Sequence, residues 1–338
     1  MTAYPEPVAA PVERALALSV RDLSVLFPAG ERVVQAVDRV SFYVREGESL
    51  GLVGESGCGK SATLRAVMGL IKPPAEVISG VAELHGRDLL AMTAAERRAV
   101  RGRSISMVFQ DPGMSLNPVF PIGEQLAEVL RVKLDLDRTD ARARALELLE
   151  RVGIPAAKDR LGSYPHELSG GMRQRVMIAI AIACSPTVLL ADEPTTALDV
   201  TIQDQVLRLL AGLQAELGMA MVLVSHDLGV IAQVCDTVAV MYAGRVVEYG
   251  PVREVLEAPR HPYTQALLRA EPTVDADAQS RLEAIDGQPP DLTGLPAGCS
   301  FAPRCAFRID ACGGASMDLD RTWPEHGSAC IRAEETRP

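Results

Sequence analysis

Apolar and polar residues alternate along the first part of the chain, from residue 16 to residue 46. This period of two residues, seen clearly from Val37 to Val44, predicts antiparallel β-strands. Later in the chain, short and nearly unbroken apolar runs are typical of buried parallel strands. These runs cover residues 48–53, 104–110, 188–191 and 221–225. Two kinds of β-sheet are therefore expected.

Segments with apolar residues at helical spacing lie between these runs and give the alternation of strands and helices that is typical of an α/β fold. The main segments of this kind are residues 62–70, 176–183 and 200–217. The stretch from Pro121 to Gly153 is also helical in period, and it interrupts the series of strands. We therefore expect an inserted α-helical subdomain at about residues 111–183.

The segment Gly54–Ser61, with the sequence GESGCGKS, follows one apolar run and precedes a helical segment. It fits the pattern of a phosphate-binding loop, in which glycines let backbone N–H groups converge on phosphate oxygens. Lys60 would reach the β- and γ-phosphates, and Ser61 would ligate Mg²⁺. A glycine-rich loop with a chance lysine is the alternative. The pattern predicts the P-loop NTPase (RecA-like) version of the α/β fold.

Polar residues stand where the unbroken apolar runs end. The four runs end in Gly54, Gln110, Asp192 with Glu193, and His226. In an open parallel sheet, ligands bind at the carboxyl ends of the strands. Each of these residues alone is more often an ordinary loop or turn residue. Together with the phosphate loop, they predict a single site around the phosphates.

A second candidate anion site lies at Leu168–Met172, with the sequence LSGGM, just before a long apolar helix. Ser169 suits a helix N-cap, and Gly170 and Gly171 would leave backbone N–H groups exposed at the start of the helix. The chain therefore offers two separate places that suit a phosphate.

The chain of 338 residues has a formal net charge of -10 and no run rich in Lys and Arg. Nucleic acid is therefore not an expected partner, because phosphate backbones select basic surfaces. Residues 1–15 lack the basic and apolar regions of a signal peptide and are expected to form a disordered tail. No uncharged apolar run reaches the roughly eighteen residues of a membrane span. We expect a cytoplasmic protein that reaches a membrane only through a partner.

Four cysteines lie close to the C-terminus with the spacing C-x5-C-x6-C-x17-C, which contains no C-x-x-C pair. The spacing alone is a weak metal signal, and free thiols in a loop-rich tail are the alternative. Residues 292–305 are rich in Gly and Pro, however, and need a staple to hold one shape. A reducing cytoplasm disfavours disulfides, so a four-thiolate metal site is a natural staple. The cysteines are Cys299, Cys305, Cys312 and Cys330.

In their order and spacing, these motifs resemble those of the ATP-binding subunits of ABC transporters, over residues 16–258. The resemblance identifies Gly54–Ser61 as the phosphate loop, Gln110 as the Q-loop glutamine, LSGGM as the signature, and His226 as the switch histidine. Asp192 and Glu193 end the magnesium-binding strand, and Ala197–Asp199 form the D-loop. The resemblance implies an ABC cassette that hydrolyses ATP, with an antiparallel β subdomain beside its core sheet.

The resemblance also implies a role for each residue. Glu193 would be the general base that polarises the attacking water, with Gln110 and His226 as further catalytic residues. Mg²⁺ would be held by Ser61, Gln110 and Asp192. Phe27 would stack on adenine, although its position alone favours an ordinary core aromatic. The residues expected to bind ATP are Phe27, Gly54, Glu55, Ser56, Gly57, Cys58, Gly59, Lys60, Ser61 and Ala62.

In this family, one ATP lies between the phosphate loop of one subunit and the signature of a second subunit. The resemblance therefore implies that the signature acts in trans, through Ser169, Gly170, Gly171 and Met172. Most of the superfamily has Gln at the position of Met172, and Met there is familiar in the peptide-importer branch.

Beyond residue 258, the resemblance narrows to importers of dipeptides, oligopeptides and related solutes. Residues 261–268 resemble the start of their C-terminal extension, which here spans residues 259–338 and ends in the four cysteines. Members carry a [4Fe–4S] cluster in this extension, so the resemblance implies such a cluster on these cysteines, with tetrahedral Zn²⁺ as the alternative. No role is expected for Cys58, Cys184 or Cys235.

The resemblance implies partners as well. They are a second, often non-identical ATP-binding subunit, two membrane permease subunits and, indirectly, an extracytoplasmic substrate-binding protein. The chain would then be peripheral, on the cytoplasmic face of the inner membrane. The expected function is ATP-driven import of di- or oligopeptides, with another solute such as a nickel chelate as the alternative.

Two other function classes account for less of the sequence. An ABC ATPase of DNA maintenance or translation would bring a long coiled coil, tandem cassettes or a basic face. A small-molecule kinase would leave LSGGM and the helical insertion unexplained.

Overall fold

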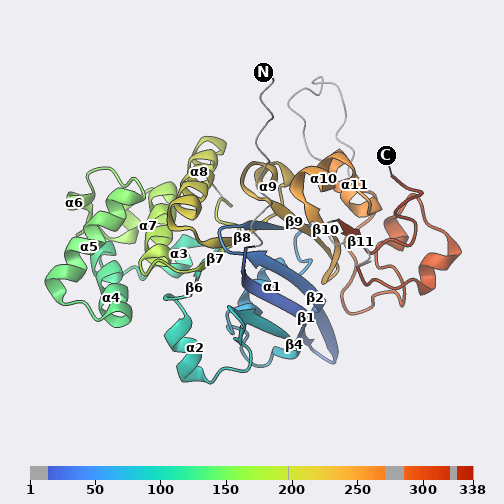
Figure 1. The fold of residues 1–338 in the computed structure, drawn as a ribbon, viewed down its shortest axis with the longest axis horizontal. Coiled ribbons are helices and arrows are strands. Elements are labelled where there is room, and N and C mark those ends of the chain that lie inside the picture. Colours follow the sequence, from blue (N-terminus) through green and yellow to red (C-terminus); the bar gives the residue numbers. More distant parts are fainter. Residues whose placement is uncertain (1–13, 197, 271–284, 320–325, 338) are drawn as a thin grey trace, which may run out of the picture.

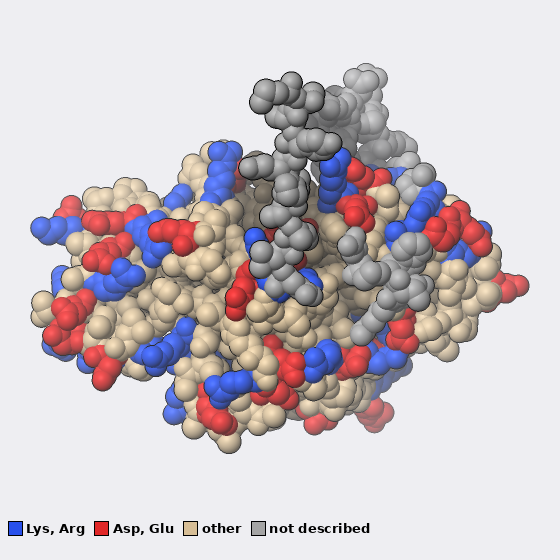
Figure 2. Space-filling model, in the orientation of Figure 1, with Lys and Arg blue, Asp and Glu red and all other residues tan. Residues whose placement is uncertain are grey.

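The computed structural model describes residues 14–196, 198–270, 285–319 and 326–337. Most of the expected N-terminal tail, residues 1–15, lies outside these ranges. Figure 1 shows β-sheets at the centre of the molecule, a group of helices at one end and the C-terminal segments at the other. Among the described helices, none combines the length and the apolar character that a membrane span requires. Acidic and basic side chains intermingle over the face drawn in Figure 2.

The larger sheet has the strand order β11-β10-β9-β3-β8-β7-β6 within the described residues. Strands β9, β3, β8, β7 and β6 are parallel. At the edge, β10 pairs antiparallel with β9, and β11 pairs antiparallel with β10. The four apolar runs form β3, β6, β7 and β8, and every residue in these strands is buried, so their prediction as parallel strands is confirmed. The bounds are β3 Ser49–Val53, β6 Ile105–Val108, β7 Val188–Asp192, β8 Ala220–Ser225, β9 Thr237–Tyr242, β10 Arg245–Pro251 and β11 Gly327–Ser328.

The smaller sheet is antiparallel, with the order β2-β1-β4-β5, which confirms the prediction from the alternating residues 16–46. Its buried face, including Leu18 and Val40, joins Leu50 of β3 and Val222 of β8 in one apolar cluster. The smaller sheet is thereby fixed beside the strand that leads into the phosphate loop. Its bounds are β1 Leu16–Ala29, β2 Arg32–Arg45, β4 Glu76–Leu84 and β5 Arg87–Asp88.

A group of helices lies between β6 and β7, where the helical insertion was expected. Leu126, Leu148 and Val176, from three of these helices, are buried in an apolar cluster that continues into the parallel sheet. Asp137 caps one helix, because its side chain accepts the N–H groups of Thr139 and Asp140. The bounds are α3 Pro112–Ser115, α4 Ile122–Leu134, α5 Arg138–Arg151, α6 Ala157–Arg160, η1 Pro165–Glu167 and α7 Gly170–Ile182.

The remaining helices cover the sheets or belong to the C-terminal extension. Helix α8 begins at the N-cap Asp199 and ends at Gly218, which has a left-handed φ of 63°. The bounds are α1 Lys60–Val67, α2 Ala94–Val100, α8 Val200–Leu217, α9 Leu228–Val234, α10 Val252–Glu257, α11 Pro262–Ala270, η2 Ala302–Arg304 and η3 Asp310–Gly314.

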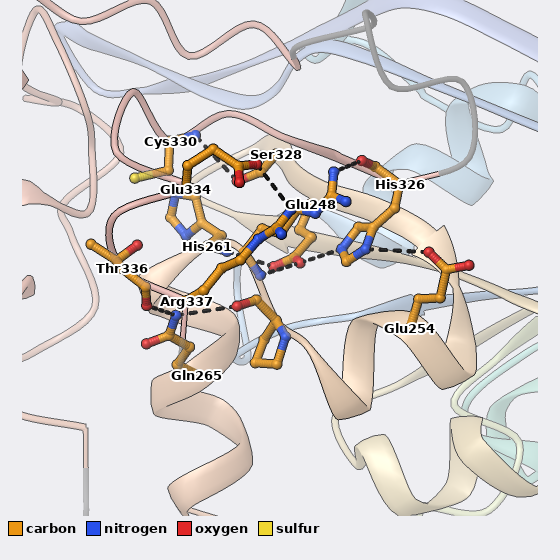
Figure 3. Close-up of polar contacts among 12 residues, drawn as sticks. Glu248, Glu254, His261, Gln265, His326, Ser328, Cys330, Glu334, Thr336 and Arg337 are labelled. Carbon is orange, nitrogen blue, oxygen red and sulfur yellow. Dashed lines mark hydrogen bonds and ion pairs between the residues drawn. The ribbon is translucent and has the colours of Figure 1, made fainter.

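The C-terminal extension is attached to the edge of the larger sheet through a buried carboxylate, Glu248 of β10 (Figure 3). Glu248 accepts the backbone N–H groups of Arg260 at 2.7 Å and His261 at 2.9 Å, and it lies 2.7 Å from Nε2 of His326. Strand β11 then pairs with β10 next to His326. This added strand was not predicted from the sequence.

His261 is fully buried in this attachment, and burial lowers its pKa to about 4, although Glu248 opposes the shift. A pKa below the ordinary 6.5 means that the contribution of His261 to stability is complete above pH 6.5 and is lost as the pH falls through 4. As the pH is lowered from 7 to 4, we expect the loss of the His261 contribution to decrease the free energy of unfolding by about 3 kcal/mol. In His261→Gln, denaturant titrations at a series of pH values should show a smaller decrease. Equal pH dependence in both proteins would contradict the assignment.

Candidate active site

The loop after β3 is shaped by glycines. Gly57 and Gly59 have left-handed φ values of 80° and 107°. A Cβ on Gly54 would lie 2.2 Å from the carbonyl oxygen of Met241, and a Cβ on Gly59 would lie 2.2 Å from the carbonyl oxygen of Ala36. Only glycine fits at these two positions, because the neighbouring atoms are backbone atoms that cannot move aside. The loop is therefore a tight cradle of backbone groups that opens into α1.

Lys60 begins α1 with its side chain almost fully buried. Its ammonium group donates to the carbonyl oxygens of Gly54 at 2.6 Å and Glu55 at 3.0 Å. The first N–H groups of any α-helix have no acceptor within the helix, and the helix dipole is positive there. The buried ammonium and the start of α1 together form a site that suits the phosphates of a nucleotide.

Asp192, the last residue of β7, lies beside the start of α1. The hydroxyl of Ser61 donates to Oδ1 of Asp192 at 2.6 Å, whereas Oδ2 is buried and has no hydrogen-bond partner among the described residues. Burial raises the pKa of Asp192, and the hydrogen bond from Ser61 opposes that shift. A hydroxyl and a buried carboxylate oxygen without a partner are hard oxygen ligands of the kind that Mg²⁺ prefers. The residues present therefore fit a magnesium ion.

Glu193 follows Asp192, and its carboxylate lies next to polar side chains that follow three neighbouring strands. Its Oε2 accepts Nε2 of Gln110 at 2.8 Å and the hydroxyl of Thr196 at 2.9 Å, and it lies 3.9 Å from Nδ1 of His226. Gln110 follows β6 and His226 follows β8, the two neighbours of β7 in the sheet. The structure thus brings together the polar residues that end the apolar runs. Glu193, Thr196 and His226 also line one cleft.

The backbone of Glu193 has a left-handed φ of 45°, which is costly for a residue with a side chain. Such a conformation persists only where the surroundings hold it, and its cost is about 1–3 kcal/mol. Here the N–H of Glu193 donates to the carbonyl of Val224 in β8 at 3.2 Å. This backbone geometry directs the carboxylate toward Gln110 and Thr196 instead of continuing the strand.

Phe27, the residue expected to meet adenine, lies near the end of β1 and is half-buried against the core. It pairs with Val34 of β2. Two residues later, the carbonyl oxygen of Ala36 lies so close to Gly59 that it leaves no room for a Cβ there. The β1–β2 ribbon therefore carries Phe27 to the neighbourhood of the phosphate loop.

The signature residues lie on a different part of the molecule. Ser169 caps α7 by accepting the N–H of Met172, and Gly170 and Gly171 open the helix. Helix α7 packs against α4, α5 and α8, and Figure 1 shows it away from α1 and the phosphate loop. A Cβ on Gly171 would lie 2.7 Å from Cγ2 of Ile202 in α8, so this glycine permits a close helix contact. The site around the loop thus forms without the signature of the same chain.

Two contacts of this site were not predicted from the sequence. Thr196 holds Glu193, and the only signal was its position three residues later, within one turn. Tyr263 of α11 accepts the N–H of Glu55 at 2.9 Å, although the two residues are far apart in sequence. No local pattern could have indicated that contact.

The four C-terminal cysteines are free, with Cys312 buried and the others half-buried. The N–H of Cys299 donates to the carbonyl of Cys312 at 2.9 Å. Burial raises the pKa of the Cys330 thiol to about 11, with smaller contributions from the other three thiols. Within the described ranges, no three His, Cys, Asp or Glu side chains are arranged to hold a metal ion.

Comparison with known proteins agrees with this geometry. The family model described as ABC transporter matches residues 37–196, and the one described as oligopeptide/dipeptide transporter, C-terminal region, matches residues 247–312. A peptide import ATP-binding protein of Brucella melitensis is 50% identical over 329 residues, covering 94% of this chain and 97% of the relative. The chain belongs to this family of ABC transporter ATP-binding proteins. The family membership expected from the motifs is therefore confirmed.

Other members of the ABC transporter family extend the comparison. The oligopeptide transport ATP-binding protein OppD of Escherichia coli is 46% identical over 318 residues, or 94% of each chain. A solved dimeric structure of an ATP-binding cassette in a post-hydrolysis state, bound to ADP and Pi, has a TM-score of 0.63 and 29% identity. It covers 70% of this chain and 99% of the cassette. The P-loop α/β fold is confirmed, and the chain is an ATPase.

Proposed function

We propose that this ATPase powers the import of di- or oligopeptides through a membrane transporter. The observation that carries the proposal is the convergence of Gln110, Glu193 and His226 beside the phosphate loop, on a chain that continues into the oligopeptide/dipeptide transporter C-terminal region. The printed names of the relatives, peptide import and oligopeptide transport, support the substrate class.

In this proposal, Glu193 acts as the general base. Glu193 and His226 line one cleft, where an attacking water would give up a proton to the carboxylate of Glu193. Gln110 and Thr196 keep the carboxylate in place through their hydrogen bonds. Lys60 and His226 would steady the negative charge on the γ-phosphate.

The remaining site residues bind and orient the nucleotide. The backbone of Gly54–Ala62 would surround the phosphates, and Phe27 would stack on adenine. Ser61, Asp192 and Gln110 would hold Mg²⁺, which when bound neutralises charge on the β- and γ-phosphates. The hydrogen bond from the Ser61 hydroxyl to Oδ1 of Asp192 keeps these two proposed ligands side by side.

A second ATP-binding subunit completes each site in this proposal. Ser169, Gly170, Gly171 and Met172 would act on the nucleotide held by the partner's phosphate loop. The position of α7 away from α1, and the dimeric state of the similar cassette, support this arrangement. One nucleotide contacted by both subunits would make closure of the dimer depend on the γ-phosphate.

A short segment with exposed apolar side chains follows Gln110 and supports contact with membrane permease subunits. Met114, Val119 and Phe120 are 87%, 69% and 52% exposed. Exposed apolar patches mark protein interaction sites. Because these residues follow Gln110 directly in the chain, docking there would connect the permease to the hydrolysis site. The chain would then lie on the cytoplasmic face of the inner membrane, and the extracytoplasmic binding protein would contact only the permease.

We place the unit boundaries at residues 16–258 for the ABC domain, with its helical subdomain at about 111–183, and 259–338 for the extension. The experiment that tests the function is purification of this chain with the proteins that accompany it in the membrane. We expect a second ATPase subunit and two permease subunits, with ATP hydrolysis stimulated by the binding protein loaded with peptide. Stimulation by a different solute alone would contradict the peptide assignment.

We also propose a [4Fe–4S] cluster on Cys299, Cys305, Cys312 and Cys330, with tetrahedral Zn²⁺ as the alternative. All-thiolate ligation suits either group. The backbone hydrogen bond from the N–H of Cys299 to the carbonyl of Cys312, at 2.9 Å, supports the proposal, because it holds two of the four cysteines next to each other. Between α11 and β11, the described residues of the extension form only the short helices η2 and η3, so they have little other regular structure to hold them together.

Metal analysis of anaerobically purified protein checks this proposal. We expect about four irons and four sulfides per chain, since the four thiolates together would hold one [4Fe–4S] cluster. Replacing Cys312 with serine should lower both contents and the thermal stability together, whereas Cys184→Ser, outside the extension, should change neither content. One zinc per chain would favour the alternative. Absence of both metals from fresh, folded protein would contradict a metal site.

A further inference from the structure

The C-terminal extension holds a residue of the phosphate loop directly. Arg304 of η2 donates to both carboxylate oxygens of Glu55, from Nη1 at 2.7 Å and from Nη2 at 3.0 Å. Paired hydrogen bonds between guanidinium and carboxylate are among the strongest polar contacts in proteins. The Arg304 side chain is 5% exposed and the Glu55 side chain 22%, so water screens the pair only weakly.

Glu55 is held at its backbone as well. Its N–H donates to the hydroxyl of Tyr263 at 2.9 Å, and its carbonyl oxygen accepts the ammonium of Lys60 at 3.0 Å. Two residues of the extension and the phosphate-binding lysine therefore meet on one loop residue. Glu55 therefore links Arg304 to Lys60, because both side chains donate hydrogen bonds to it.

Arg304 is itself fixed in place. Its Nε donates to the carbonyl of Asp286 at 2.9 Å, and its guanidinium lies 5.9 Å from the ring centroid of Tyr242. Tyr242 packs at 4.5 Å, between ring centroids, against Tyr263. The hydrogen bonds to Glu55 raise the pKa of Arg304, so its charge is permanent. The pair is therefore a rigid connection and not a transient surface contact.

The charge of Glu55 matters because its loop is shaped for a polyanion. A carboxylate within a phosphate-binding loop repels a triphosphate unless a cation neutralises it. We propose that Arg304 is a positioning residue of the phosphate loop, which neutralises Glu55 and fixes the loop so that the extension sets the affinity for ATP. This inference rests on the proposed nucleotide site.

The position of Arg304 in the sequence connects the phosphate loop to the cysteines. It lies between Cys299 and Cys305 and is the residue next to Cys305. The segment that bears Cys299 and Cys305 therefore also contacts the phosphate loop. Disorder of the cysteine segment would therefore disturb the nucleotide site through the side chain of Arg304.

The test measures MgATP and MgADP binding by the purified full-length chain, with the variants Arg304→Ala, Glu55→Gln and the double variant. In Arg304→Ala, we expect the Kd for MgATP to rise about tenfold and the Kd for MgADP to rise less, because the unpaired carboxylate repels the more charged ligand more strongly. Adding Glu55→Gln to Arg304→Ala should recover most of the loss. In the assembled transporter, Arg304→Ala should raise KM for ATP with little change in kcat.

A matched control within the extension is Arg332→Ala. Arg332 pairs with Glu335 at 2.7 Å and donates to the carbonyl of Phe307 at 2.8 Å, without touching the loop. Its loss should leave the Kd for MgATP unchanged. If Arg304→Ala does not fold, Arg304→Lys and Arg304→Gln replace it, and Lys should retain more affinity than Gln.

Wild-type affinity in the Arg304 variants would overturn the inference. So would a double variant that binds MgATP as weakly as Arg304→Ala, since the contact would then be structural only. Failure of the wild-type chain to bind MgATP would instead overturn the proposed nucleotide site, so the two failures are distinguishable.

Discussion

Glu193→Gln in the assembled transporter is expected to bind MgATP nearly as well as the wild type but to lose about 99% or more of its turnover. General bases typically contribute about 10²–10⁴-fold to a rate. The amide cannot accept the proton of the attacking water, whereas the cradle of Gly54–Ser61 and the Ser61–Asp192 pair stay intact. Steady-state hydrolysis and equilibrium nucleotide binding of the same preparations measure the two effects separately.

Two further variants distinguish loss of the general base from loss of nucleotide binding and from loss of an unrelated carboxylate. Lys60→Ala should weaken nucleotide binding itself, because it removes the buried ammonium from the loop. Glu216→Gln removes an exposed carboxylate of α8, which pairs with Arg151, and should leave hydrolysis unchanged. Wild-type turnover by the Glu193 variant would refute its assignment as the base.

Gly170→Asp is expected to abolish hydrolysis at the partner's phosphate loop while this chain still binds its own ATP. The substitution places a negative charge at the start of α7, where the proposed in-trans contact needs exposed N–H groups for an anion. Gly170 is the better position for this test. Among the described residues, a Cβ there would meet only Cδ2 of Leu198, at 3.7 Å, whereas a Cβ on Gly171 would lie 2.7 Å from Cγ2 of Ile202.

The measurement pairs this variant with a wild-type partner subunit and follows hydrolysis at each site. Gly212→Asp is the matched control, since Gly212 lies in α8 with open space around it. The isolated chain should also be a poor ATPase, because it lacks the second signature. Full hydrolysis by a demonstrably monomeric chain would contradict the composite site.

The parallel strands and their functional ends could be predicted from the sequence because both depend on local patterns. A buried parallel strand reads as an unbroken apolar run, and its end is marked by the first polar residue. Gln110, Glu193 and His226 belong to three such ends, and neighbouring strands bring them to one place. The order of the strands was not needed for that inference.

The attachment of the C-terminal extension could not be predicted, because it depends on contacts across long distances in the chain. Arg304 and Glu55 are 249 residues apart. Glu248 lies in a strand and is fully buried, which its charge alone would argue against. Its partners, including His326, come from segments without apolar periodicity. Strand β11 has two residues, too few to leave a pattern.

In the proposed function, ATP hydrolysis at this site drives peptide import. The most direct measurement is uptake of a labelled peptide into proteoliposomes that contain the assembled transporter and its binding protein, with this chain as wild type or Glu193→Gln. We expect uptake that requires MgATP on the side of this chain and that the Glu193 variant abolishes. Equal peptide uptake with the variant, or uptake without ATP, would contradict the account.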